Sequence, residues 1–201
     1  MKPRLATPYH SHQGDAHNTD SADVFGFWLY IMTDCILFST LFSTYLVLSH
    51  PTSILPLRPH INLPYVLKET FSLLASNFTF GLAVLSIKKY KLAFLQIWLI
   101  LTFLLGFNFV FMEVREFIHL VSSGYSWETS GAASAFFTLV ATHGIHVSVG
   151  LLWILVTIFQ LPLLKINALT KKRLIYLGLF WNFLDIVWIF VFTIVYLMEA
   201  I

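Results

Sequence analysis

Five long apolar stretches, separated by short polar segments, run along almost the whole chain. They fall at roughly 24–48, 65–87, 92–121, 131–160 and 173–198. Each is longer than the roughly 20 residues that a helix needs to cross a hydrocarbon core of about 30 Å. The pattern therefore predicts an all-α, polytopic membrane protein with a bundle of five transmembrane helices.

The polar segments between these stretches contain residues that end or begin helices. Four prolines, Pro51, Pro56, Pro59 and Pro64, prevent the first loop from being helical throughout. A Ser-Ser-Gly sequence at 122–124 is expected to end the third span, and Ser130-Gly131 to precede the fourth.

Composition agrees with a lipid environment. The chain has 201 residues, of which 58% are hydrophobic and 11% are charged, whereas soluble domains have about a quarter charged residues. The net charge is +2, but the basic residues lie at the ends of the apolar stretches, so no nucleic-acid partner is expected. The single cysteine, Cys35, excludes a disulfide framework. Residues 1–22 are predicted to form a disordered cytoplasmic tail, and residues 23–201 the transmembrane domain.

The distribution of lysine and arginine predicts the orientation in the membrane. The second and fourth loops hold most of these residues: Lys88, Lys89, Lys91, Lys165, Lys171, Lys172 and Arg173. The third loop has none, so the positive-inside rule assigns loops two and four to the cytoplasm. The N-terminus is then cytoplasmic and the C-terminus periplasmic, as an odd number of spans requires.

Several ionisable side chains lie inside the predicted spans, where each costs on the order of 3 kcal/mol at mid-bilayer. A rise of about 1.5 Å per residue places Asp34 roughly 15 Å and Asp185 roughly 18 Å from the inner side. It places His143 about 18 Å and Glu113 about 13 Å from the outer side. These four are near the midplane. The full set of candidate residues is Asp34, Glu69, Glu113, Arg115, Glu116, His119, His143, His146, Trp181 and Asp185.

Helical spacing arranges these polar residues in stripes. One stripe follows the second span: Glu69, Ser72, Ser76, Thr79, Ala83 and Ser86. Glu113 and Glu116 share a face of the third span; His143, His146 and Gly150 share a face of the fourth; Trp181, Asp185 and Trp188 share a face of the fifth. Such stripes serve either helix packing and subunit contact, or the binding of protons, water or lipid headgroups.

A haem or copper site is not expected in this chain. Membrane haem proteins use two histidines from different helices at one depth, and His119 and His143 differ in depth by roughly 14 Å. His143 and His146 alone would be a partial metal site, and at their depth only a carboxylate could be a third ligand. The chain also lacks a P-loop and a dinucleotide fingerprint.

Five motifs, in order, resemble those of subunit III of haem–copper terminal oxidases. They are Thr33-Asp34-Cys35-Ile36-Leu37-Phe38-Ser39, Glu69-Thr70-Phe71, Met112-Glu113-Val114-Arg115-Glu116-Phe117, Thr142-His143-Gly144-Ile145-His146-Val147, and residues 180–188, Phe-Trp-Asn-Phe-Leu-Asp-Ile-Val-Trp. The five spans are similar to the five-helix form of cytochrome bo-type ubiquinol oxidases. Asn182 stands where the family usually has a histidine, and Asp34 where many members have a glutamate.

The resemblance implies a non-catalytic subunit of a proton-translocating respiratory complex in the bacterial inner membrane. Haems and copper would belong to subunit I, and this chain would bind none. Its partners would be subunit I, together with subunits II and IV, and membrane phospholipid. Asp34 would be the buried carboxylate of proton uptake, and the other candidate residues would be hydrogen-bond or lipid contacts.

Two other functions compete with this interpretation. Subunit III of a cytochrome c oxidase would share the motifs, and a stand-alone proton or solute transporter would use the midplane carboxylates as carriers. No inverted repeat of the kind that marks many transporters is evident.

Overall fold

The computed structural model describes residues 13–49, 63–88, 92–164 and 167–197, all of which belong to helices or to the short segments that join them. The helices are α1 (Gln13–Leu48), α2 (Leu63–Lys88), α3 (Leu92–Ser122), α4 (Gly131–Leu164) and α5 (Ala168–Val191). A π-helical turn, Phe192–Leu197, continues α5. No strand occurs in the described residues, and the predicted all-α class is confirmed.

All five predicted membrane spans are present as helices. The apolar parts long enough to cross a bilayer are Val24–Leu48, Leu63–Ile87, Leu92–Ser122, Gly131–Leu163 and Ala168–Leu197. The second and fifth begin a few residues earlier than predicted. For α2 the reason is that Pro64 occupies the first turn, where the missing N–H costs no hydrogen bond.

The chain divides into two compact units, Met1–Ile36 and Leu37–Ile201. The first unit contains the N-terminal part of α1. Because α1 begins at Gln13, residues 13–22 of the expected tail are helical. Residues 1–12 lie outside the described residues, and the assignment of 1–22 as a separate tail stays a prediction.

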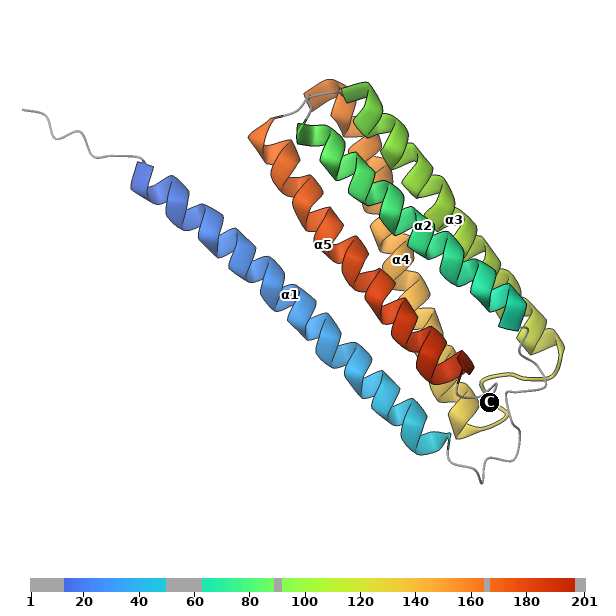
Figure 1. Ribbon diagram of the computed structural model, residues 1–201. Helices are drawn as coiled ribbons and strands as arrows, with labels where there is room; N and C mark the ends of the chain where they lie inside the picture. The colour runs from blue at the N-terminus through green and yellow to red at the C-terminus, as the bar shows by residue number, and fades with distance from the viewer. Residues whose placement is uncertain (1–12, 50–62, 89–91, 165–166, 198–201) are drawn as a thin grey trace, which may run out of the picture. The chain divides into compact units, whose positions relative to one another are not determined.

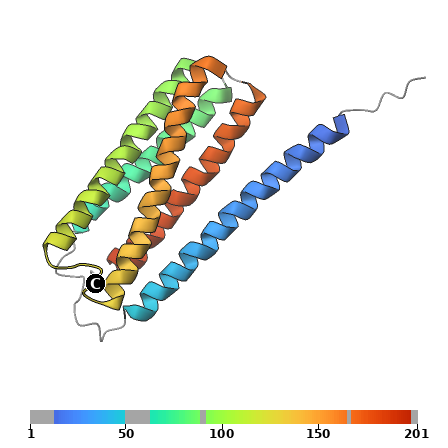
Figure 2. The same ribbon diagram turned by 180° about the vertical axis from the view of Figure 1, so that it is seen from behind.

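Within the second unit, α2, α3, α4 and α5 form a ring in which each helix packs against two others. α2 contacts α3 and α5, and α4 contacts α3 and α5, as Figure 1 shows and Figure 2 confirms from behind. The outward-facing residues are large and apolar, for example Phe71, Phe78 and Ile97. Many polar residues of the spans face inward instead, as expected of a protein whose solvent is lipid.

The helix ends follow the predicted signals. Gly124 has a φ of 86°, and the N–H groups of Gly124 and Tyr125 donate to the carbonyls of Val121 and Leu120. These two hydrogen bonds terminate α3. They require a residue in the left-handed conformation, which glycine adopts without a Cβ clash. At the start of α4, the hydroxyl of Ser130 accepts a hydrogen bond from the N–H of Ala133 at 3.1 Å.

Close helix contacts depend on two glycines that receive the Trp181 ring. A Cβ on Gly106 of α3 would lie 3.0 Å from Trp181 Cζ2, and a Cβ on Gly150 of α4 would lie 2.8 Å from Trp181 Cζ3. The indole of α5 therefore fills the space between α3 and α4 that the missing side chains leave open.

Candidate functional site

The polar stripe of α2 forms hydrogen bonds to α3. Ser72 donates to the carbonyl of Leu105 at 3.0 Å, and Ser76 donates to the carbonyl of Thr102 at 2.9 Å. The hydroxyls of Thr79 and Thr102 are 2.9 Å apart. Each of these hydrogen bonds satisfies a hydroxyl group that would find no hydrogen-bond partner among lipid tails. The helix-packing interpretation of this stripe agrees with these contacts.

Three glutamates and a tyrosine meet nearer the end of the bundle where α2 begins and α3 ends. Glu69 of α2 and Glu113 and Glu116 of α3 are all buried, with 0%, 3% and 7% of their surface exposed. They are close enough for their charges to interact. The hydroxyl of Tyr196, in the π-helical turn, donates to Glu116 Oε2 at 3.0 Å. The structure thus brings together three candidate residues that the sequence placed on two stripes, one on the second span and one on the third.

Glu113 lies directly against α4. A Cβ on Gly144 would lie 2.8 Å from Glu113 Oε1, so the carboxyl group occupies the place of a side chain on α4. The glycine between the two histidines of the fourth-span motif therefore leaves room for this carboxyl group.

His143 is fully buried in an aromatic enclosure. Its ring stacks on Trp188, with centroids 5.2 Å apart and an interplanar angle of 29°, and it meets the edge of Phe109 at 6.0 Å. Neither ring nitrogen has a hydrogen-bond partner among the described residues. His146, one turn later, is half-buried, and its Nδ1 lies 2.7 Å from the carbonyl of Thr142.

The face of α5 that carries Trp181, Asp185 and Trp188 is buried. Asp185 Oδ2 accepts a hydrogen bond from Asn77 of α2 at 2.9 Å. Trp188 Nε1 donates to Thr70 of α2 at 3.0 Å. Trp181 is buried as well, and its Nε1 has no partner in the described part of the chain. These side-chain bonds join α5 to α2 across the bundle.

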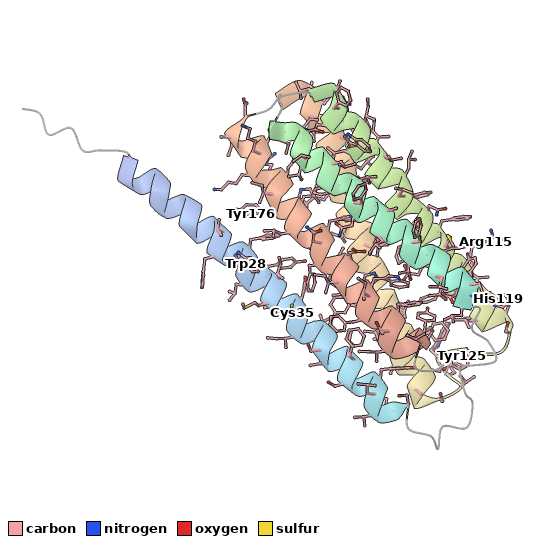
Figure 3. All side chains as sticks on the ribbon, in the orientation of Figure 1. Trp28, Cys35, Arg115, His119, Tyr125 and Tyr176 are labelled. Carbon is pink, nitrogen blue, oxygen red and sulfur yellow. The ribbon has the colours of Figure 1, made fainter. Side chains whose placement is uncertain are left out.

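Two of the candidate residues lie away from this interior. Arg115 and His119 are exposed on the outer side of α3, as Figure 3 shows, and the Arg115 guanidinium lies 5.7 Å from the ring centroid of Phe111. They share the helix with Glu113 and Glu116 but not their face. Asp34 belongs to the other unit, Met1–Ile36, and lies within the apolar part of α1.

His119 and His143 are not arranged to share a metal. His143 is enclosed by aromatic rings, whereas His119 is exposed near the end of α3. Among the residues described, no three His, Cys, Asp or Glu side chains are grouped so that they could hold an ion.

Several polar partners were not anticipated from the sequence: Asn77, Thr70, Thr102 and Tyr196. Tyr196 follows Trp181, Asp185 and Trp188 at helical spacing, so extending that stripe would have found it. Asn77 and Thr70 lie beside the predicted stripe of α2, and only the rotation of α2 against α5 shows that they face Asp185 and Trp188.

The Asn77–Asp185 bond has a measurable coupling energy. In a double-mutant cycle with Asn77→Ala and Asp185→Ala, the two changes should couple by about 0.6–1.7 kcal/mol, the range for hydrogen bonds between membrane helices. Unfolding of the chain in mixed micelles of a mild and a denaturing detergent would give the four free energies. A matched cycle with Asp185→Ala and Ser86→Ala, whose hydroxyl donates to Leu82 within α2, should show no coupling. Equal coupling in both cycles would contradict the assigned bond.

Comparisons with known proteins place this arrangement in a family. The family described as "Cytochrome c oxidase subunit III" matches residues 10–200. The chain is 51% identical to "Cytochrome bo(3) ubiquinol oxidase subunit 3" of Pseudomonas aeruginosa over 193 residues, which cover 96% of this chain and 92% of that one. It is 46% identical to the protein of the same name from Buchnera aphidicola subsp. Baizongia pistaciae, over 90% of this chain and 93% of the relative.

The likeness extends to relatives of lower identity. "Quinol oxidase subunit 3" of Bacillus subtilis is 42% identical over 183 residues, which cover 90% of this chain and 89% of the relative. The family match runs through all five spans and includes every candidate motif. The chain belongs to the cytochrome c oxidase subunit III family.

Proposed function

We propose that the chain is the accessory, non-redox subunit III of a quinol oxidase complex that passes electrons from ubiquinol to oxygen and moves protons across the membrane. The observation that carries the proposal is the 51% identity, over nearly the full length of both chains, to a protein named as a subunit of a ubiquinol oxidase. The relatives from Pseudomonas, Buchnera and Bacillus are all named as quinol oxidase subunits, which favours quinol over cytochrome c as the electron donor.

The proposed partners are subunit I, which would carry the haems and copper, and subunits II and IV. The buried polar groups of this chain support a non-redox role. Its fully buried histidine is enclosed by Trp188 and Phe109, and buried hydroxyl and amide groups bond to neighbouring helices. Each of these contacts holds the bundle together and leaves the large apolar outer surface available to subunit I and lipid.

In this proposal the complex lies in the bacterial cytoplasmic membrane, with loops two and four of this chain inside. The support is the clustering of lysine and arginine in those loops. Asp34, in the apolar part of α1, would serve proton uptake by subunit I. A hydrophobic carbodiimide should therefore label Asp34 in the intact complex, and labelling confined to other carboxyl groups would count against that role.

A phospholipid headgroup has a suitable place between α4 and α5. A cavity of about 200 Å³ there is lined by Trp153, Thr157, Gln160, Thr170 and Arg173, among others. Arg173 donates to Gln160 Oε1 at 3.2 Å, and its side chain is exposed. A cation, hydroxyls and an indole at a membrane interface suit an anionic phosphate with its acyl chains along the helices.

The proposal is tested by purifying the oxidase complex from cells that lack this chain. The haem absorption per subunit I should be unchanged, whereas the complex should dissociate more readily in detergent or lose turnover faster. Loss of a haem band while subunit I is fully retained would show that this chain holds a redox group, and would overturn the non-redox assignment.

A further inference from the structure

The three glutamates that meet between α2 and α3 have an unusual environment. Glu69 and Glu113 are almost completely enclosed, and none of their four carboxyl oxygens accepts a hydrogen bond from a donor in the described residues. A buried ionised carboxylate without donors costs many kcal/mol in a medium of low dielectric, so such groups are paired or become neutral. Something must therefore offset the charge of these groups.

No cation enters the cluster from the described parts of the neighbouring helices. On α2, Lys68 is exposed, and Tyr65 donates to the carbonyl of Met112 at 3.3 Å. On α3, Arg115 and His119 are both exposed. Other buried ionisable groups of the second unit include His143 on α4, Asp185 on α5 and Tyr196 in the π-helical turn, and His146 on α4 is half-buried. His143 finds no acceptor for a ring proton in the described part of the chain, and Tyr196 is a neutral donor.

Because the described residues supply no cation, protons can neutralise the cluster. The carboxyl groups of Glu69 and Glu116 are close enough to act on each other electrostatically. Two ionised carboxylates have only acceptors and repel, whereas a protonated one donates to the other. The hydrogen bond that Glu116 accepts from Tyr196 favours the charged form of Glu116, so Glu69 is the better donor of the pair.

We propose that Glu69, Glu113 and Glu116 form a proton-binding site, in which Glu69 carries a proton that it donates to Glu116 and Glu113 is a neutral acid packed against Gly144. This site is separate from Asp34, and it does not depend on the proposed function. Glu69 is six residues from the start of α2, and Glu116 six from the end of α3, which places both about 9 Å from that end of the bundle. The bound protons are thus close enough to the surface to exchange.

Infrared spectroscopy of the full chain in lipid nanodiscs tests the site without any substitution. The chain would be made with glutamate isotope-labelled at the side-chain carboxyl carbon. Of its five glutamates, Glu69, Glu113 and Glu116 are the ones in the described spans. At neutral pH, a label-sensitive C=O band of protonated carboxylic acid should appear and shift in deuterium oxide. If all the labelled glutamate absorbs as carboxylate, the proposal is wrong.

Substitutions then assign the shared proton. Glu69→Gln and Glu116→Gln should each remove or shift the same part of the acid band, and the double variant should remove no more than Glu69→Gln alone. Tyr196→Phe should shift the carboxylate band of Glu116. Asp185→Asn is the matched control, because it alters a buried acid bonded to Asn77 and should leave the labelled glutamate bands unchanged. Independent, additive losses from Glu69→Gln and Glu116→Gln would overturn the shared proton.

Discussion

Replacing Trp188 with alanine is expected to lower the free energy of unfolding by about 3–5 kcal/mol, the cost of deleting a large buried aromatic side chain. Trp188 is fully buried, stacks on His143, and meets the edge of Phe109 with centroids 4.6 Å apart. The substitution also removes the hydrogen bond that the indole N–H donates to the Thr70 hydroxyl at 3.0 Å. The cavity, the lost ring contacts and the lost bond all act in the same direction.

The measurement is unfolding of the chain in mixed micelles of a mild and a denaturing detergent, followed by circular dichroism. Trp127→Ala is the control, because Trp127 is 55% exposed and its ring contacts Phe137 at a centroid distance of 6.1 Å. The control should cost far less than Trp188→Ala. Equal losses for the two tryptophans would contradict the packing of α5 against α2 and α4.

Gly150→Leu is expected to cost roughly 3 kcal/mol, toward the upper end of what overpacking a core costs. Even a Cβ at this position would lie 2.8 Å from Trp181 Cζ3 and 3.2 Å from Phe180 Cε1. Both rings are buried and cannot move outward without separating α4 from α5. The result should therefore be a loss of stability together with loosened α4–α5 contacts.

The matched control is Gly81→Leu on α2. A Cβ there would meet nothing within 4 Å, and the position is exposed. In the same detergent titration this variant should be as stable as the parent chain or slightly more stable, because leucine favours the helix over glycine. If Gly150→Leu were tolerated as well as Gly81→Leu, the close approach of α4 and α5 at Trp181 would be wrong.

The fold could be predicted in detail because lipid imposes few choices. A chain in hydrocarbon must satisfy its backbone within helices, so the lengths of the apolar stretches determined the five spans. The helix boundaries at Ser122 and Ser130 followed from local chemistry, since a glycine ends one helix and a serine hydroxyl caps the next. The helical period alone placed Glu69, Ser72 and Ser76 on one face of α2, and the structure shows that this face is buried.

The candidate site was predicted less completely, because one helix does not specify the rotation of its neighbour. Periodicity placed Asp185 on one face with Trp181 and Trp188, but nothing in the sequence indicated Asn77 as its partner. Arg115 and His119 were candidates because they are ionisable and lie in the same predicted span as Glu113 and Glu116, whereas on α3 they point outward. The role of Gly144 as the place for the Glu113 carboxyl group required the distance between α3 and α4.

The central claim, that this chain is a colourless subunit of a larger quinol oxidase, is tested most directly by an affinity purification in mild detergent followed by an absorption spectrum. A tagged chain expressed in its own cells should bring down a larger haem-bearing protein, and the haem absorption should leave with that partner when the complex is dissociated. A tagged chain that is recovered alone, or that keeps the haem absorption after its partners are removed, would contradict the claim.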